Sequence, residues 1–164
     1  MKKWILMLLA TLTLFSVGIY QGSVHAGSIK TVKGVNKKIS KDLKLAKGWA
    51  DGSLDEDGNP TDSGTPNQDW AWTAYVSKIK YSSSDKESLG DLRVYVNQEF
   101  LNLGKHDRNT VIKNSIRYSY DAINDYYEMS YDDMKEGPMT DIFLAKTPIG
   151  ISRLSNHFKF KWYE

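Results

Sequence analysis

The feature that most constrains the fold of this chain is a segment whose apolar residues repeat at helical spacing. It lies between segments in which apolar and polar residues alternate, as they do in strands. Residues 105–124 repeat apolar side chains every three or four positions and place polar residues elsewhere on the helical wheel. The repeating residues are Ile112, Ile116, Tyr120 and Ile123. Residues 91–96, before this stripe, alternate apolar and polar side chains, as a strand with one buried face does. Together they predict a helix that packs on one face of a sheet.

The segments around this helix predict the other strands. Residues 73–81 and 91–96 are expected to form a hairpin across a turn. Gly137 and Pro138 end the connection that follows the helix, and further strands are expected at residues 139–146, 149–153 and 158–163. This order predicts an α+β fold, with an antiparallel sheet of about four to five strands packed on one side by the main helix at about residues 105–124.

The N-terminal segment has the three parts of a secretory signal peptide. Two lysines precede an apolar run over residues 4–17, and small residues follow at Val24 and Ala26. We therefore predict a signal peptide over residues 1–26, cleaved between Ala26 and Gly27. The alternative is an uncleaved membrane anchor, but crossing a bilayer takes roughly 20 predominantly apolar residues and this run is shorter.

Cysteine is absent, and this limits both structure and chemistry. The absence excludes disulfides, a thiol nucleophile and a lipid-modified cysteine, so the exported domain must fold by packing alone. Removal of residues 1–26 takes away two of the 22 basic residues and leaves 20, equal in number to the 20 acidic ones. A neutral product whose basic segment lacks interleaved aromatics predicts no nucleic-acid partner. A short lysine-led signal in a chain without cysteine is typical of Gram-positive bacteria, so we expect a secreted or envelope-associated protein.

Residues 27–48 form a basic amphipathic arm. Its apolar residues recur at helical spacing, and a helix is expected over residues 37–47. The lysines on this arm are candidate binding residues for an anionic wall polymer or a membrane surface. They are Lys37, Lys38, Lys41 and Lys44. The alternative is a surface helix that docks its apolar stripe on the domain and keeps its lysines in solvent.

Residues 49–69 form an acidic linker rich in Gly, Pro and Asp, and residues 70–164 form the α+β domain. Within the linker, Asp55 to Asn59 resembles the start of a calcium-binding loop. Such a loop needs Gly at its sixth position and Glu at its twelfth, and here Pro60 and Pro66 stand there. No metal site is therefore predicted.

Motifs for catalysis or for a cofactor are not found, so no cofactor is predicted and catalytic residues stay unassigned. A wall-directed hydrolase of glycan or peptide remains the alternative. Ser152 and His157 are conceivable as its nucleophile and base. A pair of acids is also conceivable, taken from Asp121, Asp125, Glu128, Asp132 and Asp133.

Aromatic residues are the second group of binding candidates. Trp70, Tyr126 and Tyr127 could stack on sugar rings or anchor a protein partner. The alternative is that such residues belong to the core or to its margin.

The C-terminal half, with Gly150, Ser152, Asn156 and the Lys161-Trp162 pair, resembles small exported α+β proteins of Gram-positive bacteria that have no assigned activity. The resemblance supplies no site residues. We expect an exported, non-enzymatic protein that binds at the envelope or outside the cell. The alternatives are the hydrolase above and a secreted effector or bacteriocin-like protein.

Overall fold

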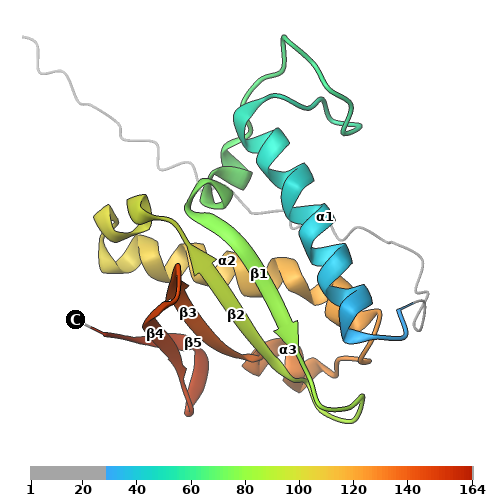
Figure 1. Cartoon of the computed structure of the whole chain (residues 1–164), viewed down its shortest axis with the longest axis vertical. Helices are drawn as coiled ribbons and strands as arrows, with labels where there is room; N and C mark the ends of the chain where they lie inside the picture. Colours follow the sequence, from blue (N-terminus) through green and yellow to red (C-terminus); the bar gives the residue numbers. More distant parts are fainter. Residues whose placement is uncertain (1–28, 164) are drawn as a thin grey trace, which may run out of the picture.

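The computed structural model describes residues 29–163, and in this range the chain forms five strands, three α-helices and two 3-10 helices (Figure 1). The strands are β1 (Val76–Ser82), β2 (Asp91–Val96), β3 (Met139–Leu144), β4 (Thr147–Arg153) and β5 (Asn156–Trp162). The helices are α1 (Val32–Asp51), η1 (Gln68–Tyr75), η2 (Gln98–Asn102), α2 (Lys105–Asn124) and α3 (Tyr131–Glu136). The predicted signal peptide over residues 1–26 and its cleavage site at Ala26 and Gly27 lie outside the described residues.

The five strands form one sheet in the order β1-β2-β3-β4-β5, which confirms the predicted α+β class. Neighbouring strands are antiparallel except for β2 and β3, which pair in parallel. The exception follows from the connection, because η2, α2 and α3 lie between these two strands and return the chain to the end of the sheet where β2 began.

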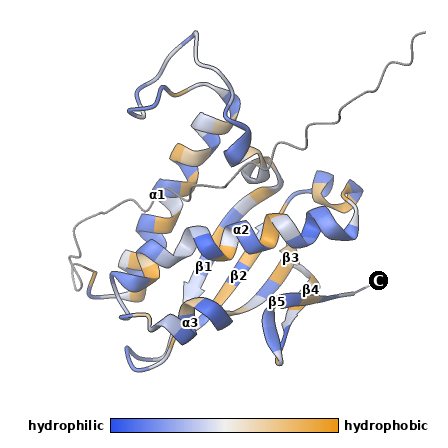
Figure 2. Cartoon of the chain, turned by 180° about the vertical axis from the view of Figure 1, so that it is seen from behind, coloured by the Kyte–Doolittle hydropathy of each residue, from blue (hydrophilic) through white to orange (hydrophobic). Residues whose placement is uncertain are grey.

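Helix α2 covers one face of the sheet and has the bounds that the sequence predicts. Its buried side chains are Val111, Ile112, Ser115, Ile116, Ser119, Ala122 and Ile123. They meet the inward-facing residues of the strands, such as Leu92, Val94 and Ile142, which are fully buried. Figure 2 shows α2 in front of the strands on this side. Burial of these apolar surfaces supplies the main favourable term in folding.

Helix α1 is longer than the predicted segment 37–47. It begins after Thr31, whose side chain accepts a hydrogen bond from the backbone N–H of Gly34, and it ends at Gly52, which has a φ of 74°. Its stripe of Val35, Ile39 and Leu43 belongs to the same hydrophobic core as the sheet. The helix therefore docks on the domain, as the second interpretation of the basic arm proposed.

The acidic segment after α1 is a loop that folds back on the helix. The indole N–H of Trp49 donates to the backbone oxygen of Asp55 at 2.8 Å, and Leu54 packs directly over Gly48. The Asp55 carboxylate accepts hydrogen bonds from the backbone N–H groups of Asp57 and Asn59. These contacts give residues 49–69 a defined path beside α1.

Candidate functional site

The candidate site begins with a second face of α1. Four lysines and Ser40 follow one another at intervals of three and four residues, so they lie on one side of the helix. The lysines are Lys33, Lys37, Lys44 and Lys47. This face is turned toward strand β1, at the edge of the sheet.

Between this face and β1 lies a groove of about 590 Å³. Strand β1 contributes Lys78 and Lys80 to it, so six lysines line the groove together with neutral residues, and no acidic side chain lines it. Among the residues that the structure describes, none of these six lysines makes an ion pair. The groove therefore concentrates positive charge in a partly enclosed space, where opposite charges attract more strongly than on an open surface.

Asn36 sets the distance between α1 and β1. Its side-chain amide donates to the backbone oxygen of Tyr81 and accepts from the backbone N–H of Tyr81, each at 2.8 Å. The polar backbone groups of Tyr81 therefore point away from β2. Because these directions alternate along an antiparallel strand, the N–H and C=O of Ile79 point toward the groove as well. A ligand in the groove can thus meet backbone groups as well as lysines.

Burial changes the pKa of one lysine in the groove, Lys47. Partial burial lowers the pKa of Lys47 from its ordinary value, because the charged form loses part of its hydration. A bound anion would oppose this effect by stabilising the charged ammonium.

The four predicted lysines of the basic arm have different surroundings. Lys37 and Lys44 line the groove, whereas Lys41 is exposed and lies outside it. Lys38 faces α2 and pairs with Asp42 at 3.1 Å and with Asp121 at 3.6 Å. Burial by itself would lower the pKa of Lys38, but its hydrogen bond to Asp42 and the nearby carboxylates give a net rise. Lys38 thus links α1 to α2.

The binding residues predicted from the sequence do not include Lys33, Lys47, Lys78 and Lys80, which also line the groove. The helical spacing of the first two with Lys37 and Lys44 could have identified them, because they share one face of α1. Lys78 and Lys80 lie on a strand, and the sequence contains no local signal that this strand lies beside α1.

The predicted aromatic residues do not gather at the groove. Trp70 is half-buried, and its ring lies 5.5 Å from those of Trp49 and Tyr118. Tyr126 packs edge-on against Tyr81, and the hydroxyl of Tyr127 donates to Asp133. All three predicted residues, Trp70, Tyr126 and Tyr127, pack at the margin of the core.

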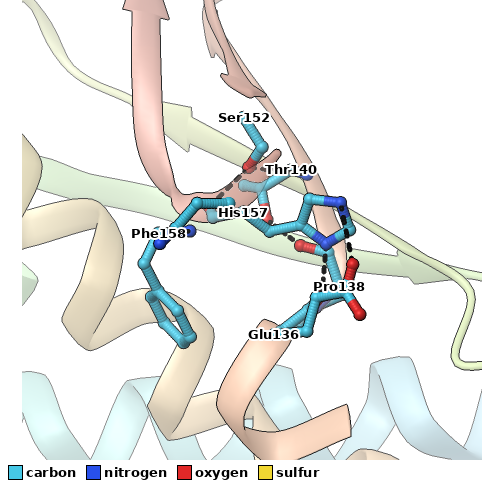
Figure 3. Close-up of polar contacts among 8 residues, drawn as sticks. Glu136, Pro138, Thr140, Ser152, His157 and Phe158 are labelled. Carbon is cyan, nitrogen blue, oxygen red and sulfur yellow. Dashed lines mark hydrogen bonds and ion pairs between the residues drawn. The ribbon is translucent and has the colours of Figure 1, made fainter. Parts of the chain in front are cut away.

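Ser152 and His157 are close together, but they do not form a nucleophile and base pair. The buried hydroxyl of Ser152 donates to the backbone oxygen of His157 at 2.8 Å and accepts from the N–H of Thr140. The imidazole of His157 donates from Nδ1 to the backbone oxygen of Gly137, and its Nε2 lies 3.8 Å from Glu136 (Figure 3). These side chains hold β3, β4 and β5 together, and the ring is directed away from the hydroxyl.

No group of three or more side chains that could hold a metal ion occurs in residues 29–163. At the segment that resembles a calcium loop, the carboxylate of Asp55 is occupied by backbone donors. The hydrogen bond from Asn59 is the largest of the influences that lower the pKa of Asp55. Within the same residues, no helix is both long and apolar enough to cross a bilayer.

The fold and the site define an α+β domain with a lysine-lined groove at the edge of its sheet. A scan against protein-family models, a search of curated proteins and a search of solved structures each found no match. The geometry of the groove is therefore the basis for assigning a function.

Proposed function

We propose that this chain is an exported, non-enzymatic protein that binds an anionic polymer of the cell envelope in the groove between α1 and β1. The observation that carries the proposal is the set of six lysines that line this groove without an acidic residue among them. Export is proposed from the signal peptide predicted at residues 1–26.

The shape of the groove favours a linear polymer as its ligand over a flat partner such as a membrane surface. The lysines of α1 extend from Lys33 to Lys47, and at about 1.5 Å per residue this row is roughly 21 Å long. Lys33 and Lys37, and likewise Lys44 and Lys47, are about one helical turn apart, whereas Ser40 separates Lys37 from Lys44 by about two turns. A polymer along this row therefore meets two pairs of lysines. Lys78 and Lys80 line the opposite wall, and a chain lying between the walls contacts both sets.

Each contact contributes little when it is exposed, so affinity has to come from several contacts made together. Salt screens such contacts, and the Debye length is about 10 Å at 0.1 M ionic strength. Binding should therefore weaken steeply as salt rises. This dependence distinguishes attachment through lysines from apolar contact.

The first test uses the full chain expressed in a Gram-positive host. Medium, wall and membrane fractions are separated at low and high salt, and the intact mass of the product is measured in each. The proposal expects a product that begins at Gly27 and that salt releases from the wall. A full-length product in the membrane fraction that resists salt would mean that the N-terminal segment is an uncleaved anchor, and it would contradict both the predicted cleavage and attachment through the lysines.

The second test measures binding of the purified product to long-chain inorganic polyphosphate by titration calorimetry. We compare Lys37→Glu/Lys44→Glu with a control of equal charge change, Lys30→Glu/Lys41→Glu. Lys30 and Lys41 are exposed and lie outside the groove. The groove variant should lose at least tenfold in affinity and the control should lose much less. Equal losses would mean that net charge alone attracts the polymer, and the groove proposal would be wrong.

A further inference from the structure

The second face of the sheet carries a pattern that the basic groove does not explain. Cross-strand pairing places Lys78, Tyr95 and Phe143 side by side on adjacent strands, and it places Lys80, Arg93 and Asp141 in the next row. These rows alternate with the buried residues that face α2, so they lie on the opposite face. Figure 1 views the sheet from this face, with α2 behind the strands.

Tyr95 and Phe143 form a stacked pair in the middle of this face. Their ring centroids are 5.4 Å apart and their planes differ by 23°. Both are half-buried; Lys78 is paired with Tyr95, and the next row holds Lys80, Arg93 and one acidic residue, Asp141. The faces of such rings carry partial negative charge, and the weakly positive C–H groups of a sugar ring pack well against them.

Beside this pair is a hollow of about 600 Å³, at the ends of the parallel strands β2 and β3. Tyr95 lines it together with Gln98, whose exposed amide can both donate and accept hydrogen bonds. Ala145 also lines it, and its φ of 54° belongs to the two-residue turn that joins β3 to β4.

The hollow adjoins the basic groove. Ser77 and Lys78 line both spaces, and the β-bulge between Val76 and Lys78 lies at this junction. Bulges redirect side chains and are common next to functional sites. A single elongated ligand can therefore contact the lysines of the groove and the aromatic pair at once.

We propose that the hollow and the Tyr95–Phe143 pair form a sugar-binding subsite, and that the ligand is an anionic glycan. Its negative groups occupy the groove between α1 and β1, while one of its sugar rings packs against Tyr95 and hydrogen-bonds to Gln98. This inference rests on the proposed function, since it names the class of polymer that the groove takes. A polyanion without sugar rings uses the groove only.

The experiment compares three probes on the processed protein by titration calorimetry. Polygalacturonate supplies sugar and charge, polyphosphate supplies charge without sugar, and dextran supplies sugar without charge. Tyr95→Ala should weaken polygalacturonate binding by about fivefold, the range of one aromatic contact, and leave polyphosphate binding unchanged. The control is Tyr131→Ala, because Tyr131 is 78% exposed on α3, and it should affect neither probe.

Gln98→Ala provides a second variant at an exposed position that does not depend on core packing. It should also reduce binding of polygalacturonate selectively. If wild type binds polyphosphate through the groove but neither variant changes polygalacturonate binding, the sugar subsite is wrong and the proposed function stands. If wild type binds neither polyanion, the proposed function fails as well. Dextran binding as tight as polygalacturonate binding would overturn the claim that the glycan is anionic.

Discussion

The side-chain amide of Asn36 makes the two backbone hydrogen bonds that a neighbouring strand would otherwise make with Tyr81. It donates to the backbone oxygen of Tyr81 and accepts from its backbone N–H, both at 2.8 Å, although 45 residues separate the two in sequence. Strand β1 is at the edge of the sheet, where unpaired backbone groups invite pairing with another chain. The amide satisfies two of these groups and joins α1 to the sheet.

Replacing Asn36 by alanine should destabilise the fold. The change removes both hydrogen bonds to Tyr81 and leaves partly buried backbone groups unpaired, so we expect the free energy of unfolding to fall by about 2–3 kcal/mol. Urea unfolding followed by circular dichroism measures this. The exposed Lys41→Ala on the same helix is the control and should stay within about 0.5 kcal/mol of wild type. A similarly small effect of Asn36→Ala would show that the amide pairing contributes little to stability.

Gly48→Ala should be destabilising although alanine favours helices. A Cβ atom at residue 48 would lie 2.4 Å from Cγ of Leu54, far closer than atoms pack. We expect a loss of about 1–3 kcal/mol, typical of overpacking, in place of the gain of about 1 kcal/mol that helix propensity predicts. In a Leu54→Ala background only the Cβ of residue 54 remains, at 3.3 Å from the added Cβ, so Gly48→Ala should there cost much less than in wild type. Equal effects in both backgrounds, measured by urea unfolding, would show that Leu54 is not the cause.

Stability should fall in alkaline solution because of two partly buried tyrosines, Tyr118 and Tyr120. Burial raises the pKa of Tyr120 to about 12 and raises that of Tyr118 further. Between the ordinary tyrosine pKa of about 10 and these values, the unfolded chain loses protons that the folded chain keeps, so unfolding becomes more favourable as the pH rises. The urea midpoint should therefore decrease from pH 10 to pH 12. Tyr120→Phe should reduce this slope, whereas the exposed Tyr131→Phe should leave it unchanged.

Filling the groove should change the protonation of Lys47. Burial lowers the pKa of this lysine in the free protein. An anion beside it stabilises the charged form, so saturating polyphosphate should move the pKa of Lys47 upward. NMR titration of its ¹³Cε resonance with and without polyphosphate measures the change. An unchanged pKa at saturation would place the bound polymer elsewhere.

Local patterns in the sequence predicted the elements whose residues repeat without interruption. Helix α2 and strand β2 have the predicted bounds, because the helical and the strand periods are strong over residues 105–124 and 91–96. Helix α1 exceeds the predicted segment 37–47 because Gly34 weakens the pattern near its start. In the fold, the Thr31 cap and the close packing of Gly34 against Ile29 compensate for the glycine.

The sequence by itself determined the class of fold, the length of α2 and the presence of lysines at helical spacing on α1, because these properties depend on residues close together in the chain. Only the tertiary structure decided which lysines meet. The groove requires α1 to lie along the edge of β1, and that contact depends on core packing and on the pairing of Asn36 with Tyr81. The stacked pair of Tyr95 and Phe143 likewise depends on the parallel register of β2 and β3, which are joined through α2. Contacts between residues so far apart in sequence leave no periodic pattern in the chain.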